Sequence, residues 1–130
     1  MLNPFPIQFL ALIAYFLLRV FLGIALLYLG VRHLKYRREI ISHVSWLPTG
    51  SWIGIVLGVF EIGVAIFILL GYYTQYAVLL LGLHAIEMLL VRHWFTHHSL
   101  PPRLFYWLVL GICLSLFITG AGAPAIDLPI

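Results

Sequence analysis

A few ionisable side chains stand out in this sequence because long apolar runs surround them. Arg19 lies within the apolar run 7–30, and Glu61 lies at the middle of the run 52–70. If both runs cross a membrane, an isolated charge at the centre of either would cost about 2.5–3.5 kcal/mol. Two antiparallel helices would bring Arg19 and Glu61 to the same depth, where pairing recovers part of that cost. We therefore expect an intramembrane charged pair.

Two roles are open for this pair. It can fix packing and register between two helices, or it can take part in binding or proton handling, because a ligand that drew Arg19 away would leave Glu61 to take up a proton. Small residues share the helical face of each charge: Gly23 with Arg19, and Gly54 and Gly58 with Glu61. Such residues let two membrane helices approach closely. We expect these glycines to mark the packing face.

A second pair lies in the apolar run 74–91. His84 and Glu87 are three residues apart, so they project from one face of a helix and form a possible ligand or proton site. Two side chains are too few for a catalytic metal site, which usually has at least three protein ligands, and Glu61 is the nearby group that could join them. A hydrogen-bonded pair without metal is the alternative.

Three histidines form a third cluster in a polar segment. His93, His97 and His98 have the spacing His-x-x-x-His-His, which is similar to one histidine box of membrane desaturases and hydroxylases. Those enzymes need several such boxes, and the six histidines of this chain do not supply them. The cluster is a weak metal candidate; the alternative is a wet loop that contacts lipid phosphates. The single cysteine, Cys113, excludes a dithiol pair within the chain.

The composition indicates which kind of fold holds these residues in place. Apolar residues make up 64% of the 130 residues, and charged residues only 8%, whereas an ordinary soluble domain carries about 25% charged residues. The chain lacks the polar surface that water requires, so its solvent is lipid. Disorder, nucleic-acid binding and a secreted disulfide scaffold are excluded. We expect an all-α protein, an integral membrane four-helix bundle.

The apolar runs divide the chain into four spans within a single domain, 1–130. About 20 apolar residues are needed to cross a hydrocarbon core about 30 Å thick. The predicted helices cover about 7–30, 52–70, 74–91 and 103–120, with a basic connector at 31–51.

The basic residues predict the orientation. The connectors 31–51 and 92–103 hold six of the seven Lys and Arg residues. Short loops rich in Lys and Arg stay in the cytoplasm. Both connectors should therefore be cytoplasmic, with both termini on the opposite side of a bacterial or archaeal cytoplasmic membrane.

The order of residues along the chain resembles the DoxX family of small four-helix membrane proteins. The resemblance lies in 18–23 (LRVFLG), in Glu61 with Gly63, and in 71–77 (GYYTQYA). The ending agrees as well, because 117–122 (FITGAG) is followed by 125–128 (AIDL), which contains Asp127.

The resemblance carries implications for some residues and not for others. It implies that Arg19 and Glu61 occupy the family's intramembrane basic and acidic positions, and that Gly71 and Thr74 form its turn after the second helix. His84, Glu87 and the cluster at 93–98 are not part of the family pattern. The family is named after a membrane subunit associated with thiosulfate:quinone oxidoreductase, and some relatives are linked to oxidoreductase complexes or to the chaperoning of membrane proteins.

These observations leave three functions open. The first is a membrane subunit of a quinone-linked oxidoreductase, in which His84, Glu61 and Arg19 serve a quinone as donor, proton acceptor and charge anchor, without a complete redox centre or a covalent cofactor in the chain. The second is a non-enzymatic, chaperone-like assembly partner. The third is a small transporter, which the one-sided loop charge disfavours. We expect the partners to be the lipid bilayer and another protein or a second copy of the chain.

Overall fold

The structure, a computed structural model, describes residues 7–42, 52–94 and 100–120, and every regular element in these ranges is a helix. The helices are α1 (Ile7–Lys35), α2 (Arg37–Ser42), α3 (Trp52–Leu70), α4 (Thr74–Val91) and α5 (Arg103–Thr119). By length and composition α1, α3 and α4 can each cross a membrane, and α5 is an apolar helix of 17 residues. The expected all-α membrane bundle is confirmed.

The first helix is longer than the sequence predicted. It continues past residue 30 and ends at Lys35, and the basic residues Arg32 and Lys35 lie in its last turn. Positive charges at a helix C-terminus interact favourably with the helix dipole, so they extend the helix instead of ending it. The predicted basic connector therefore begins five residues too early, and α2 occupies part of it.

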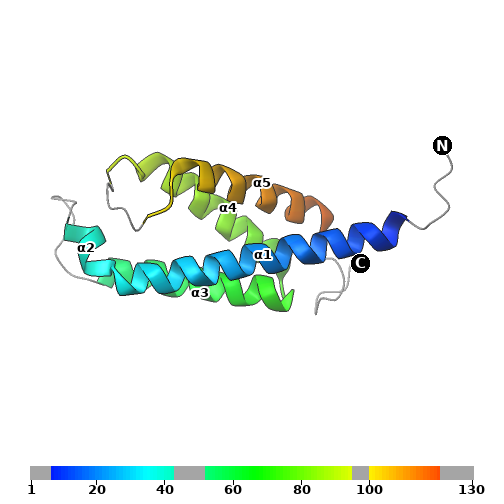
Figure 1. Cartoon of the computed structure of the whole chain (residues 1–130), viewed down its shortest axis with the longest axis horizontal. Helices are drawn as coiled ribbons and strands as arrows, with labels where there is room; N and C mark the ends of the chain where they lie inside the picture. Colours follow the sequence, from blue (N-terminus) through cyan, green and yellow to red (C-terminus); the bar gives the residue numbers. More distant parts are fainter. Residues whose placement is uncertain (1–6, 43–51, 95–99, 121–130) are drawn as a thin grey trace.

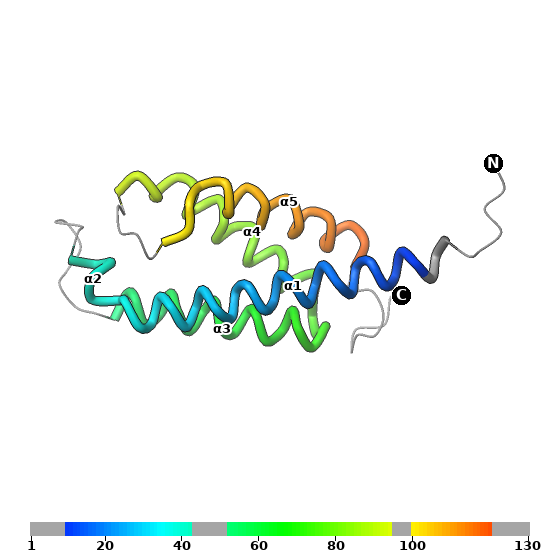
Figure 2. The backbone as a smooth tube through the Cα atoms, in the orientation of Figure 1, coloured from blue at the N-terminus to red at the C-terminus, as the bar shows by residue number. Residues whose placement is uncertain are grey.

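The long helices form two antiparallel pairs. In Figures 1 and 2, α1 lies alongside α3, and α4 lies alongside α5. The two pairs diverge toward the end of the bundle where α2 lies (Figure 1). The buried core lies where the pairs meet, with Leu26, Ile68, Leu81, Ala85 and Leu116 among its members.

Glycines bring α1 and α3 into close contact. A Cβ placed on Gly23 would lie 2.5 Å from Cγ of Leu69, and one on Gly30 would lie 3.2 Å from Cβ of Glu61. On the facing helix, a Cβ on Gly58 would lie 3.1 Å from the carbonyl oxygen of Gly30. These contacts fix the register: Gly30 lies beside Gly58 and Glu61, while Gly23 lies beside the C-terminal part of α3.

A tight turn joins the two pairs. Gly71 has a φ of 64°, in the left-handed region that suits glycine. The N–H of Gly71 donates to the carbonyl of Ile68 (3.2 Å), and that of Tyr72 donates to Phe67 (3.1 Å), which is the Schellman ending of a helix. Because only three residues separate α3 from α4, the two helices run antiparallel and face each other near the turn.

Arg92 connects α4 and α5 at the end of this helix pair that lies opposite the turn. Its Nε donates to the carbonyl oxygen of Pro101 (3.0 Å) and its Nη2 donates to that of Leu100 (3.5 Å). These bonds connect the end of α4 to the segment that precedes α5. They place the first turn of α5, which contains Tyr106, next to the last turn of α4.

Candidate functional site: a buried His–Glu–His network

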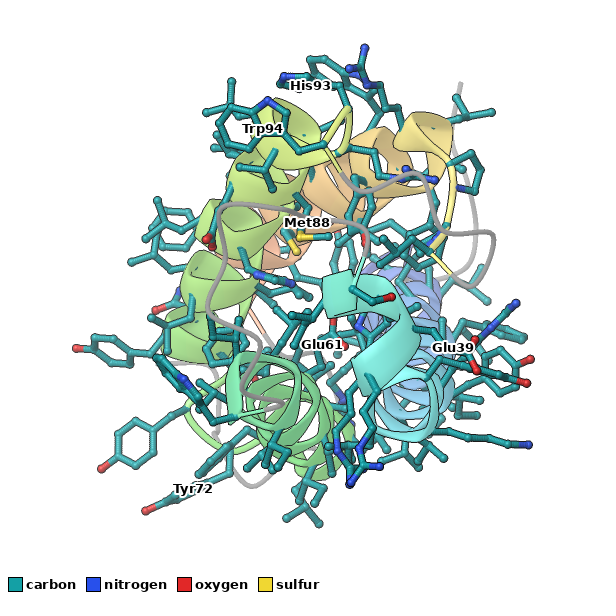
Figure 3. All side chains as sticks on the ribbon, turned by 90° about the vertical axis from the view of Figure 1, so that its left-hand side faces the viewer. Glu39, Glu61, Tyr72, Met88, His93 and Trp94 are labelled. Atoms are coloured by element: carbon teal, nitrogen blue, oxygen red, sulfur yellow. The ribbon has the colours of Figure 1, made fainter. Side chains whose placement is uncertain are left out.

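The candidate site is centred on Glu61, which is completely buried at the middle of α3. Figure 3 shows this residue between the helices, whereas Tyr72, His93 and Trp94 lie at the periphery. Its Oε2 lies 2.6 Å from Nδ1 of His33, and its Oε1 lies 3.3 Å from Nε2 of His84. Each carboxylate oxygen therefore has its own histidine.

Three helices supply the three side chains. His33 comes from the last turn of α1, where the absence of a side chain at Gly30 lets that helix approach Glu61. His84 comes from α4, which the turn at Gly71 sends back along α3. The network is thus assembled by the close α1–α3 contact on one side and by the tight turn on the other.

Burial and hydrogen bonding together determine what this network can do. A carboxylate removed from water is costly unless other groups donate hydrogen bonds to it. The 2.6 Å separation between Nδ1 of His33 and Oε2 of Glu61 requires one proton between them. Imidazole can accept a proton at one nitrogen and release one from the other. The network is therefore able to hold and pass protons.

The predicted pair between Arg19 and Glu61 does not form in the described part of the chain, where the ion-pair partners of Glu61 are His33 and His84. The prediction matched the centres of two apolar runs, but the glycine contacts set a different register. Arg19 precedes Gly30 by eleven residues, which is about 16 Å along a helix. Arg19 is nevertheless buried, and its guanidinium lies 5.3 Å from the centre of the Phe16 ring.

The second predicted pair is close in space. Nδ1 of His84 lies 3.6 Å from Oε2 of Glu87, whose side chain is 70% exposed on the surface of the chain. The ring of Phe60 packs edge-on to the His84 ring at 5.4 Å between centres. His84 thus contacts Glu61 through one ring nitrogen and approaches Glu87 through the other, while Phe60 restricts its orientation.

A groove of about 590 Å³ lies between α3 and α4, where these helices diverge. This volume is within the range of small-molecule sites, roughly 300–1,000 Å³. Its lining is mostly apolar, with two polar residues, His84 and Glu87. The apolar lining residues are Trp52, Ile53, Val56, Leu57, Phe60, Leu80 and Leu83.

Two further polar atoms lie in the interior, at residues that the sequence did not predict to belong to a site. Nε2 of His33 and the hydroxyl of Tyr106 are buried without a hydrogen-bond partner among residues 7–42, 52–94 and 100–120. Tyr106 interacts electrostatically with Glu61 and Arg92. One signal for His33 was present, because it continues the stripe of Gly23 and Gly30 at helical spacing.

In the part of the chain that the structure describes, only His93 of the histidine cluster is present, so the weak metal candidate stays a prediction. No group of three or more His, Cys, Asp or Glu side chains there could hold a metal ion. His93 is exposed, with Nδ1 2.9 Å from the carbonyl oxygen of Leu90 and its ring against that of Trp94. His97 and His98 lie outside the described residues.

Comparison with known proteins identifies the family. The DoxX family model matches residues 14–97, which include His33, Glu61 and His84. The closing segments that resemble DoxX, 117–122 and 125–128, lie beyond the matched range. The chain matches no curated protein and no solved structure. Since the match covers more than half of the 130 residues, the chain belongs to the DoxX family.

Proposed function

We propose that this membrane protein is a subunit of a quinone-linked oxidoreductase system and that the groove between α3 and α4 binds the quinone head group. The observation that carries the proposal is the position of His84. This side chain lines the apolar groove and also bonds the buried Glu61. A molecule in the groove would thus meet a proton-handling network at its wall.

The chemistry of the groove suits a quinone. A quinone carries electrons and protons between membrane proteins, and it has an apolar body and two carbonyl oxygens. Trp52 and Phe60 offer aromatic surface to a flat ring, and a ring nitrogen of His84 can donate a hydrogen bond to a carbonyl. Glu87 and Glu61 can exchange protons with His84 from its two sides.

Arg19 has no part in this site. The sequence suggested it as a charge anchor for the quinone, but it lies about 16 Å along α1 from the residue that faces Glu61. We propose a packing role for Arg19 at the other end of the bundle. We propose that a partner protein supplies the electrons; the single cysteine of the chain cannot form a redox-active dithiol pair.

We also propose that the groove opens in the cytoplasmic half of the membrane. The end of α1 and the start of α5 carry Arg32, Lys35 and Arg103, and Arg92 follows α4. Antiparallel packing places these charges at one end of the bundle, which also holds Trp52. Lys and Arg favour the cytoplasmic side, so the same end should face the cytoplasm.

The test is extraction of whatever co-purifies with the protein in mild detergent, followed by mass analysis. We expect quinone in near-stoichiometric amount, and we expect His84→Phe to lose it. His93→Phe is the matched control, because it removes an exposed histidine far from Glu61 and should retain the quinone. Recovery of phospholipid alone from the wild-type protein would contradict the proposal and favour an assembly role.

A further inference from the structure

Four ionisable side chains from three helices form a row across the bundle. The row runs from Glu87 to His84 (3.6 Å), from His84 to Glu61 (3.3 Å) and from Glu61 to His33 (2.6 Å). The two middle residues each use two different atoms. His84 faces Glu87 through Nδ1 and Glu61 through Nε2, while Glu61 faces His84 through Oε1 and His33 through Oε2.

Burial increases along the row. Glu87 is 70% exposed at the edge of the groove, His84 is 6% exposed, and Glu61 and His33 are fully buried. Glu87 precedes the end of α4 at Val91 by four residues, about 6 Å, so its carboxylate is near the membrane surface. The row therefore leads from an accessible carboxylate to the interior of the bundle.

The interior end of the row is open. Nε2 of His33 is buried and has no hydrogen-bond partner in the described part of the chain. Buried polar groups in a purely structural network are normally satisfied, and a buried ion pair is rarely more stable than apolar side chains of similar size. An open end and a cost in stability both indicate a role other than packing. Tyr106 is the other titratable group that interacts with Glu61 on this side, and Tyr106 interacts in turn with Arg92.

We propose that Glu87, His84, Glu61 and His33 form a proton relay that connects the groove with a buried proton store at His33. The proposal rests on the proposed quinone site only for the identity of the molecule that exchanges protons in the groove. Because a quinone takes up more than one proton, a single histidine at the groove would not suffice. The relay supplies a further proton from the interior.

Each transfer balances. As Nδ1 of His84 gives its proton to an acceptor in the groove, Nε2 takes the proton that Oε1 of Glu61 carries. Oε2 of Glu61 then takes the proton from Nδ1 of His33. One proton leaves the row at the groove, and His33, which starts as the imidazolium, becomes a neutral imidazole that keeps its proton on Nε2. The return of a proton through Glu87 reverses the same steps.

The relay can be tested without quinone. In protein labelled with ¹⁵N-histidine and reconstituted in nanodiscs, the exchange rate of the His33 ring proton with water is measured by NMR. We expect measurable exchange with water in the wild-type protein although His33 is completely buried, at a rate still slow enough on the chemical-shift timescale to leave the ring proton resonance resolved. We expect His84→Phe, which interrupts the row, to slow that exchange by about a hundredfold, the scale of a general acid–base contribution. His93→Phe is the histidine control and should leave the rate unchanged.

A second variant, Glu87→Gln, keeps the test informative if His84→Phe does not fold. Glu87→Gln alters only an exposed side chain, so the bundle should form normally. The exchange at His33 should still slow, because the amide introduced by this substitution cannot accept and return a proton. Exchange at the wild-type rate in both variants would overturn the relay. Because these rates are measured without ligand, loss of the relay and failure to bind quinone are separate results.

Discussion

The two faces of α3 have opposite character. Toward α1, Gly58 brings the two helices so close that a Cβ there would lie 2.5 Å from Cγ of Leu34. Toward α4, the helices diverge and leave a groove of about 590 Å³ lined by large side chains such as Trp52 and Phe60. Glu61 lies between the two faces and bonds to both neighbouring helices. The comparison shows how one helix can be closely packed on one side and form the wall of an open groove on the other.

This division explains the position of the ionisable groups. The close contact with α1 fixes His33 against Glu61, so that part of the network is held tightly at 2.6 Å. The contact with α4 is looser, at 3.3 Å, and His84 also forms part of the groove wall. A tightly held buried end and a less constrained end at the groove are what a proton store and its outlet require.

Removal of the central carboxylate should have the largest effect. Glu61→Leu leaves two buried histidines without their common partner and should destabilise the protein by about 3–5 kcal/mol. The free energy of unfolding is measured by denaturation in detergent micelles. The double variant His33→Leu with Glu61→Leu should recover part of this loss, because it removes both members of the shorter bond. Strictly additive losses would show that the two residues do not interact.

Arg19 gives the matching test of the other end of the bundle. Because Arg19 makes no bond to Glu61, the effects of Arg19→Leu and Glu61→Leu should add within about 0.5 kcal/mol. A double-mutant cycle measures this directly. If the double variant instead recovered the stability lost in the single variants, the result would support the charged pair that the sequence suggested.

The face of α3 that packs against α1 should tolerate an added methyl group less well than an open position of the same helix. Gly58→Ala places a methyl group against Leu34 and the backbone of Gly30 and should cost about 1–3 kcal/mol. Gly63→Ala is the control, because a Cβ there has no atom within 4 Å among the described residues, and its cost should be near zero. Thermal unfolding in detergent compares the two variants. Equal losses would contradict the difference between the faces.

Truncation of a side chain on the groove face of α3 should leave the fold intact but lower the affinity for quinone. Phe60→Ala removes a ring that lines the groove and orients His84, so the quinone affinity should fall by about tenfold, or 1.4 kcal/mol. Quenching of tryptophan fluorescence by a short-chain benzoquinone reports the affinity, since Trp52 also lines the groove. Phe21→Ala on α1, whose ring is 70% exposed, should leave the affinity unchanged. A similar loss in both variants would place the quinone elsewhere.

The smallest effect is expected at the peripheral histidine. His93→Ala alters an exposed side chain that packs against Trp94, so the free energy of unfolding should change by less than about 0.5 kcal/mol. Unfolding in detergent measures it. A loss of several times this size would mean that the histidine cluster contributes to the fold.

The sequence predicted the helices well because long apolar runs have one stable form in lipid. It predicted the partners of Glu61 poorly, because register depends on packing between helices and not on the centre of each run. Ending the first helix at residue 30 placed His33 in a connector, whereas the helix extends to Lys35. His84 and Glu87 were found because their spacing of three residues lies within one helix. Contacts between residues of different helices could be identified only from the structure.

Glu61 holds the network together through its bonds to histidines from the two neighbouring helices. The most direct test is ¹⁵N and ¹H NMR of histidine-labelled protein, because a short hydrogen bond to a carboxylate shifts a ring N–H proton far downfield. We predict such a resonance from His33 in the wild-type protein and in Arg19→Leu, and its loss in Glu61→Leu. A His33 resonance that Glu61→Leu leaves unchanged, or that Arg19→Leu abolishes, would contradict the network described here.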